Sequence, residues 1–169
     1  MTSTTGRNNS RAFTLVELLL VLVIISAVLA ISAPSLRGFF ASRQTADTAT
    51  TMLSLAKLAR TESIAQGRPW RLNIDAASGE FWLTAQDYGT FATLNSSWGR
   101  RFRIPDGASI SVDAQSASSK PEVSYVQFYP TGRTDVASVE ITGRQGDVFI
   151  VANPSATEPF QVLSASEVR

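Results

Sequence analysis

The chain has 169 residues, 44% of them hydrophobic, and a formal net charge of +1 at pH 7, which suits one compact domain with an appendage. It contains neither cysteine nor histidine. Disulfide bonds, Cys/His zinc sites and imidazole general bases are therefore excluded, and we expect no enzymatic activity, no cofactor and no metal site. The near-neutral charge also argues against a globally basic surface for nucleic acid.

The first third of the chain changes abruptly from polar to apolar. Residues 1–12 are polar, with Arg7 and Arg11 as their charges, and cannot bury enough apolar surface to fold alone. Residues 18–33 carry no charge, and residues 13–16 extend the apolar character on the other side of Glu17. At 1.5 Å per residue, a helix over 13–33 spans about 30 Å, the thickness of a bilayer's hydrocarbon core. The sequence therefore predicts a membrane-spanning helix.

Two other interpretations of this segment stay open. A secretory signal peptide would use Arg7 and Arg11 as its basic region and residues 28–30 as its cleavage site, whereas an uncleaved anchor would use the apolar run alone. Glu17 fits neither, because an ionised carboxylate inside an apolar helix costs roughly 2.5–3.5 kcal/mol at the bilayer centre. Its presence indicates that it meets a partner.

Residues 11–18, Arg-Ala-Phe-Thr-Leu-Val-Glu-Leu, resemble the processing signal of type IV pilins and type II secretion pseudopilins. The resemblance implies that a prepilin peptidase removes residues 1–12 by cutting between Ala12 and Phe13 on the cytoplasmic side. Phe13 then becomes an N-methylphenylalanine, and Glu17 pairs with the terminal amine of a neighbouring subunit. The chain departs from the family pattern at Ala12, where glycine is usual. Alanine is the next smallest side chain, so we expect cleavage to persist.

The physical chemistry of Glu17 agrees with this assembly role. A buried carboxylate and a buried ammonium are each costly in lipid, but two subunits that bring them together neutralise both. The pair favours one axial register of helix against helix, which a filament requires.

Residues 34–66 are predicted to form the amphipathic continuation of the helix. Its apolar residues recur at steps of three and four: Leu36, Phe39, Phe40, Ala46, Ala49, Met52, Leu53, Ala56, Leu58 and Ala59. Gly67 and Pro69 predict an end at about Gln66. We expect the second half of this stretch to pack on a sheet, and the half with Phe39 and Phe40 to contact neighbouring helices. A coiled-coil dimer is the alternative.

After Pro69 the apolar period changes to two, which predicts a β-rich domain over 67–169. Strands are predicted at 70–74, 80–84, 110–112, 123–129, 136–142, 148–152 and 160–163, and loop-rich stretches at 86–101 and 113–122. The first two strands should pair as a hairpin through 75–79. The predicted fold class is α+β: a long N-terminal helix, transmembrane and then amphipathic, packed on an antiparallel sheet or β-sandwich, as in pilins.

The order of a hairpin, a loop-rich middle, the run Phe128-Tyr129-Pro130-Thr131-Gly132 and two further strands resembles the H-type minor pseudopilins of type II secretion and the related FimT/FimU minor pilins. The resemblance implies a minor pseudopilin that joins the periplasmic pseudopilus near its tip and helps to drive folded proteins across the outer membrane. Its partners would be other pseudopilins, the prepilin peptidase and the inner-membrane secretion platform. It would cross the inner membrane once, with a cytoplasmic N-terminus and a periplasmic globular domain.

Two alternatives to this function are carried forward. A FimT/FimU-like minor pilin would serve pilus initiation or DNA uptake, but the elements Gly132-Arg133 and Gly143-Arg144 lack the second arginine of DNA-binding relatives, so nucleic acid is not an expected partner. A membrane-anchored periplasmic enzyme would need a catalytic constellation that this sequence lacks.

One basic and aromatic cluster is a candidate for partner contact: Trp98, Arg100, Arg101, Phe102 and Arg103. Its rings and guanidinium groups could meet an acidic patch on a partner or stack on single-stranded DNA. DNA binding usually needs a wider basic surface. The competing interpretation is that Trp98 and Phe102 cap the core while the arginines are solvated.

Four aspartates fall in predicted loops without the spacing of a calcium-binding loop, and we interpret them as solvated turn residues: Asp106, Asp113, Asp135 and Asp147.

Overall fold

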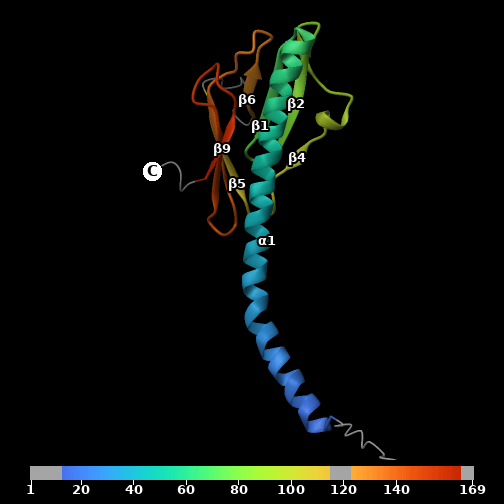
Figure 1. Ribbon diagram of the computed structural model, residues 1–169. Coiled ribbons are helices and arrows are strands. Elements are labelled where there is room, and N and C mark those ends of the chain that lie inside the picture. Colours follow the sequence, from blue (N-terminus) through green and yellow to red (C-terminus); the bar gives the residue numbers. More distant parts are fainter. Residues whose placement is uncertain (1–12, 115–122, 165–169) are drawn as a thin grey trace, which may run out of the picture. The chain divides into compact units, whose positions relative to one another are not determined.

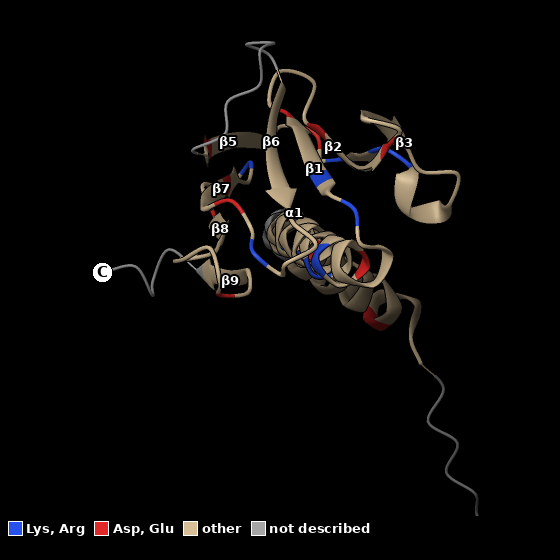
Figure 2. Ribbon diagram, turned by 90° about the horizontal axis from the view of Figure 1, so that it is seen from above, with Lys and Arg blue, Asp and Glu red and all other residues tan. Residues whose placement is uncertain are grey.

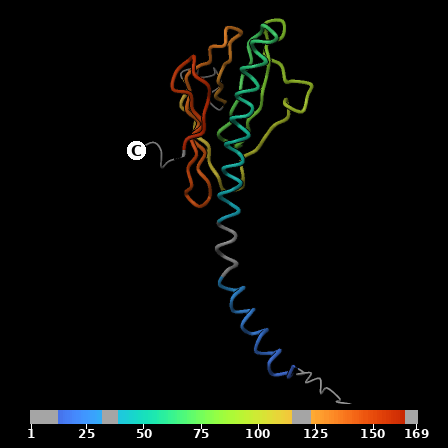
Figure 3. The backbone as a smooth tube through the Cα atoms, in the orientation of Figure 1, coloured from blue at the N-terminus to red at the C-terminus, as the bar shows by residue number. Residues whose placement is uncertain are grey.

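The computed structural model describes residues 13–114 and 123–164, without the side chains of 32–38 and 164 (Figure 3). The chain divides into two compact units, Met1–Gly38 and Phe39–Arg169. The predicted leader, 1–12, and most of the predicted loop at 113–122 lie outside the described residues.

Helix α1, Leu15–Gln66, confirms the long N-terminal helix expected from the sequence (Figure 1). In the second unit its buried side chains recur at steps of three and four, as an amphipathic helix requires: Thr45, Ala49, Met52, Leu55, Ala56, Ala59 and Ser63. The helix ends at Gln66 as predicted. Gly67 follows with φ +64°, a left-handed conformation that glycine adopts without a side-chain clash and that commonly terminates helices.

The first sheet is antiparallel and contains the predicted hairpin. It is built from β1 (Trp70–Asp75), β2 (Glu80–Asp87), β3 (Thr90–Thr93), β4 (Phe102–Arg103) and β6 (Val123–Phe128). The order is β3-β2-β1-β6, with β4 also paired to β2. Asp75 lies opposite Glu80 at the closed end of the hairpin, and Trp70 lies opposite both Ala85 and Phe128.

The second sheet is also antiparallel, in the order β5-β7-β8-β9. Its strands are β5 (Ser109–Ala114), β7 (Ala137–Thr142), β8 (Val148–Ala152) and β9 (Gln161–Ser164). Seen from above, the two sheets lie beside α1 on different sides (Figure 2). This arrangement confirms an α+β fold with one helix packed on antiparallel sheets.

The core lies where α1 meets both sheets. Met52 and Leu55 of the helix share one cluster with Leu72 and Phe81 of the first sheet and Ile141 of the second. Two hydrogen bonds also connect the helix to loops. The guanidinium of Arg60 donates to the carbonyl oxygen of Thr157 (2.7 Å), and the hydroxyl of Ser63 donates to the backbone carbonyl oxygen of Tyr129 (3.2 Å).

The expectation of a loop over 86–101 is wrong in part, because β3 and a short 3₁₀ helix, η1 (Ser97–Gly99), form there. Strand β3 reads Thr-Phe-Ala-Thr and has little apolar alternation of its own. The segment forms a strand because it pairs with β2, which provides its hydrogen bonds, although its own sequence pattern does not predict one. The run Phe128–Gly132 contains a turn, in which the N–H of Gly132 donates to the Tyr129 carbonyl at 2.9 Å.

Candidate functional site

The start of α1 is fixed by Thr14, a residue that our sequence analysis did not single out. Its side-chain oxygen accepts a hydrogen bond from the backbone N–H of Glu17 at 3.2 Å, and its carbonyl accepts one from Leu18 at 3.2 Å. Thr14 is therefore the N-cap, and Glu17 occupies the third helical position. The sequence signal was available, since Thr-x-x-Glu before an apolar run is a capping-box pattern.

The position of Glu17 in the first turn has an electrostatic consequence. The backbone N–H groups at a helix N-terminus carry a partial positive charge that favours a nearby carboxylate. Phe13, the predicted first residue after processing, lies two residues before the helix and is 74% exposed. Ala12 lies outside the described residues, so the processing site itself stays a prediction.

The apolar part of α1 has no covered face within the described residues. Every Phe, Leu, Ile and Val side chain between positions 13 and 31 is exposed, and the least exposed of them, Val21, has 44% of its surface accessible.

Within the described part of the chain, no helix combines the length and the apolar character that crossing a membrane requires.

The structure divides the basic and aromatic cluster into two groups. The first centres on Glu80, whose carboxylate oxygens accept hydrogen bonds from Arg101 (3.0 Å) and Arg103 (2.9 Å). These two bonds lower the pKa of Glu80 from its ordinary value of 4.5. Arg101 also lies 4.1 Å from the ring centroid of Trp82. These two arginines are exposed, yet they already have an acidic partner within the chain.

The second group is Trp98, Arg100 and Phe102. Phe102 stacks on the buried Phe81, with ring centroids 5.6 Å apart, and packs against the core as one of our interpretations expected. Trp98 does not cap the core in the same way, since 48% of its surface is exposed on η1. The guanidinium carbon of Arg100 lies 4.5 Å from the Phe102 ring centroid, and no described carboxylate is within ion-pair distance of it.

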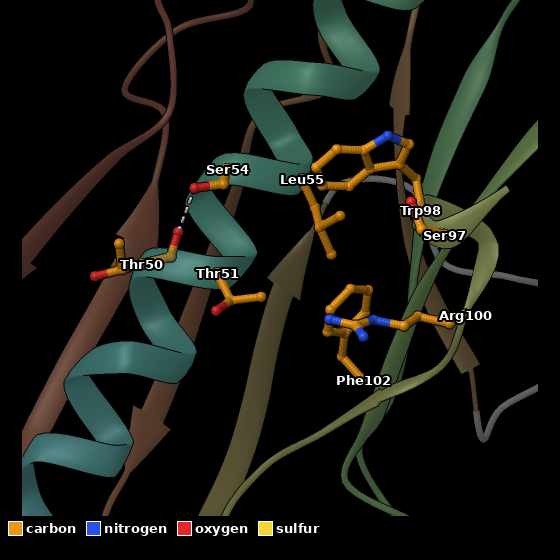
Figure 4. Close-up of a pocket in the computed structure, with 8 residues that line it drawn as sticks. All are labelled: Thr50, Thr51, Ser54, Leu55, Ser97, Trp98, Arg100 and Phe102. Atoms are coloured by element: carbon orange, nitrogen blue, oxygen red, sulfur yellow. Dashed lines mark hydrogen bonds between the residues drawn. The ribbon is translucent and has the colours of Figure 1, made fainter.

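These residues form one wall of a groove of about 410 Å³, here called the α1–η1 groove (Figure 4). Helix α1 provides the facing wall, which the sequence alone did not associate with the cluster. The groove is lined by Thr50, Thr51, Ser54, Leu55, Ser97, Trp98, Arg100 and Phe102. In this groove apolar, aromatic and cationic side chains lie together.

Arg71 lies between two aromatic rings on the first sheet. The sequence analysis did not predict this cluster. The guanidinium carbon of Arg71 lies 3.6 Å from the ring centroid of Phe91 and 4.0 Å from that of Tyr125. Its Nε–H donates to the side-chain oxygen of Gln127 at 2.9 Å. No local pattern marks this cluster, because its members come from β1, β3 and β6 and meet only through sheet pairing.

Two of the four loop aspartates are not the solvated turn residues that we expected. Asp135 accepts hydrogen bonds from the hydroxyl of Tyr129 (3.2 Å) and the N–H of Gln127 (3.1 Å). Burial of Tyr129, together with the charge and hydrogen bond of Asp135, raises the pKa of the Tyr129 phenol. The carboxylate oxygens of Asp147 are buried beside Gly143. Each carboxylate lies against groups of the domain only four to eight residues away in sequence, rather than in a solvated turn.

Asp106 and Asp113 are exposed, as expected, but Asp113 lies within strand β5, opposite Ser138, and not in a turn. Among the described residues there is no group of three or more acidic side chains placed to hold a metal ion. The arginines of the two Gly-Arg elements, Arg133 and Arg144, are exposed.

Comparisons with known proteins agree with this geometry in two separate parts of the chain. Residues 7–33 match the model of the prokaryotic N-terminal methylation motif, and residues 48–157 match that of the type II transport protein GspH. A search of curated proteins finds no match.

Two solved structures of the minor pseudopilin EpsH from the type II secretion system of Vibrio cholerae share the fold. One aligns with a TM-score of 0.61 at 12% identity, covering 73% of this chain and 99% of that one. The other aligns with a TM-score of 0.60 at 10% identity, covering 73% and 95%. At such low identity the likeness shows the fold alone, whereas the GspH match extends over more than half of the chain. With its N-terminal methylation motif and its helix packed on two antiparallel sheets, the chain belongs to the GspH family of type II transport pseudopilins.

Proposed function

We propose that this chain is a minor pseudopilin of a type II secretion system, assembled near the tip of the periplasmic pseudopilus that drives export of folded proteins across the outer membrane. The observation that carries the proposal is the joint presence of the methylation motif over 7–33 and the GspH domain over 48–157. The motif supports membrane-proximal processing and assembly, and the domain belongs to a family of type II transport proteins. The fold shared with EpsH is consistent with this assignment.

The N-terminal part of the proposal concerns processing and anchoring. The prepilin peptidase cuts between Ala12 and Phe13 and methylates Phe13, and residues 13–33 then hold the mature chain in the inner membrane with its globular domain in the periplasm. The methylation-motif match supports this assignment. So do the exposed apolar side chains between Phe13 and Ile31, because apolar surface is stabilised when lipid or protein removes it from water.

Glu17 is the proposed assembly residue. The Thr14 cap holds its backbone in the first helical turn, four residues from the proposed new amino terminus. Its carboxylate would pair with the terminal amine of a neighbouring subunit, because each charge alone is costly in an apolar environment. The role is structural, and catalysis has no part in it. The partners are other pseudopilins, as the family implies, together with the prepilin peptidase and the inner-membrane platform.

The test uses the full chain in cells that carry the other pseudopilins and the prepilin peptidase. Mass spectrometry of membrane-extracted protein should find a mature chain beginning at methylated Phe13, and fractionation should find it in pseudopilus filaments. The Glu17→Ala variant should be processed normally but fail to enter filaments, with secretion reduced. Glu62→Ala, which removes a half-buried glutamate whose carboxylate is bonded to Gln66 in the distal part of α1, is the matched control and should assemble normally.

A chain that begins after Ala30 or keeps residues 1–12 contradicts the proposal, as does normal assembly of Glu17→Ala. Filaments of a type IV pilus rather than a secretion pseudopilus would favour the FimT/FimU-like alternative.

A further inference from the structure

The side chains of the α1 wall of the α1–η1 groove have few free hydrogen-bond donors. The hydroxyls of Thr50, Thr51 and Ser54 each donate to the carbonyl oxygen four residues earlier in the helix, at 2.9, 2.8 and 2.9 Å. A hydroxyl bonded back to its own helix in this way has no proton left to donate to a ligand and can only accept. This wall therefore offers a partner the methyl groups of its threonines and hydroxyl acceptors, but no free hydroxyl donor.

The other residues of the groove continue this apolar character. Leu55 is 1% exposed, and Phe102 is half-buried on the ring of Phe81. The indole of Trp98 projects beside them from η1, with 48% of its surface exposed (Figure 4). An exposed indole next to a buried leucine and a fixed phenylalanine is a favourable place for another apolar side chain, since tryptophan dominates the binding energy at many interfaces.

Arg100 gives the groove its charge. It is the one charged side chain among the described residues that line the groove. Arg101 and Arg103, close to it in sequence, share the carboxylate of Glu80, whereas no described carboxylate lies within ion-pair distance of Arg100. A guanidinium held over an aromatic ring keeps its edge available for a carboxylate, and it binds such a group in two parallel hydrogen bonds.

We propose that the α1–η1 groove is a docking site for a neighbouring pseudopilin, which inserts an apolar side chain beside Trp98 and pairs an adjacent carboxylate with Arg100. The inference rests on the proposed function and deepens it by naming the contact surface and the chemistry of the partner. Charge complementarity selects the partner, because a lone cation beside an apolar wall binds an acidic and apolar segment better than a basic or fully polar one. A groove of about 410 Å³ is near the lower end of the range for ligand pockets, roughly 300–1,000 Å³, which suits one or two side chains.

Nucleic acid is the other class of ligand that rings and an arginine could attract. It is disfavoured here, because stacking platforms for single strands combine several aromatic side chains with a continuous basic track. Arg101 and Arg103, which would have to extend that track, are already paired with Glu80.

The experiment places a benzophenone-bearing residue at Ser97, an exposed groove position, in the full chain expressed with the other pseudopilins and the prepilin peptidase. Irradiation should give an adduct with another pseudopilin, and the cross-linked peptide should carry Asp or Glu beside a large apolar residue.

Arg100→Glu should lower the adduct yield at least about tenfold, the equivalent of one lost charge-assisted contact. Arg100→Lys should retain most of it. Trp98→Ala should lower the yield as well. Because Trp98 is exposed, the variant should fold, and a circular dichroism spectrum that matches the parent's excludes misfolding as the cause.

The matched control is Arg144→Glu, which reverses the charge of an exposed side chain in the turn between β7 and β8 and should leave the adduct yield unchanged. Absence of an adduct, an adduct with nucleic acid or with a second copy of this chain, or insensitivity to Arg100→Glu overturns the docking proposal. Incorporation into filaments is measured in the same cells. Normal incorporation without the predicted adduct overturns the docking proposal and leaves the proposed function intact. Absence of the parent chain from filaments overturns both the docking proposal and the proposed function.

Discussion

Asn153 and Ala137 are joined by two hydrogen bonds at one end of the second sheet. The backbone N–H of Asn153 donates to the carbonyl oxygen of Ala137 at 3.2 Å, and the N–H of Ala137 donates to the side-chain oxygen of Asn153 at 2.9 Å. The Asn153 amide also donates to the carbonyl oxygens of Asp135 (3.2 Å) and Ser155 (2.9 Å). Asn153 is 2% exposed, and this one side chain connects the start of β7 to the end of β8.

Asn153→Ala should therefore destabilise the domain. It removes three hydrogen bonds and leaves buried backbone groups without partners, a loss of roughly 2–4 kcal/mol in the free energy of unfolding. Urea unfolding followed by circular dichroism measures it. Asn95→Ala removes an exposed asparagine and is the control, with no expected change. Equal unfolding midpoints for the two variants would contradict the role of Asn153.

Tyr88 occupies a backbone conformation that suits glycine or asparagine better. It has φ +45°, is followed by Gly89 with φ +86°, and joins β2 to β3 in a two-residue turn. Its side chain is fully exposed, so no packing offsets the strain. Tyr88→Asn should raise the free energy of unfolding by about 0.5–1 kcal/mol, because asparagine tolerates the left-handed region. Thermal unfolding measures the effect. Tyr88→Ala keeps a poorly suited residue and should give no such gain; an equal gain in both would show that the backbone is not the cause.

Gly99 is required by a close approach of chain segments. A Cβ at this buried position would lie against the carbonyl group of Leu94, while the N–H of Gly99 already donates to Ser96 at 3.0 Å. Gly99→Ala should displace η1 and cost about 1–3 kcal/mol, as overpacked sites do. Near-ultraviolet circular dichroism should report the altered surroundings of Trp98, with Ser97→Ala as the neighbouring control. An unchanged spectrum and midpoint would refute the close approach.

Glu80 should contribute to the acid sensitivity of the domain. Hydrogen bonds from Arg101 and Arg103 lower its pKa below the ordinary value of 4.5. The folded state therefore binds the proton more weakly than the unfolded state, so the stabilisation is present above that ordinary pKa and is lost as the pH falls through the folded value. Urea midpoints measured between about pH 6 and pH 3 should fall less steeply for Glu80→Gln than for the parent chain.

Glu158→Gln, which changes an exposed glutamate, should keep the parent's slope and serves as the control. A Glu80→Gln slope identical to the parent's would mean that the pair with Arg101 and Arg103 adds nothing to stability.

Elements with strong local signals were predictable from the sequence. The end of α1 at Gln66 follows from an amphipathic period that stops before Gly67 and Pro69, and the hairpin of β1 and β2 follows from two alternating runs around a turn. Strand β3 was missed because Thr-Phe-Ala-Thr has weak alternation and Tyr88-Gly89 is not the usual Asn-Gly turn. The Thr14 cap could have been found from its Thr-x-x-Glu spacing.

The sequence by itself determined the processing motif, the long helix and the β-rich class of the domain, because helix periodicity, caps and turns depend on residues within a few positions of one another. Only the tertiary structure decided how the basic and aromatic cluster is used. Glu80 pairs with Arg101 and Arg103 through the contact of β2 with β4, and Arg100 and Trp98 are left facing α1. Such partners are many residues apart, and strand register and helix packing, which arise from burying the whole core at once, bring them together.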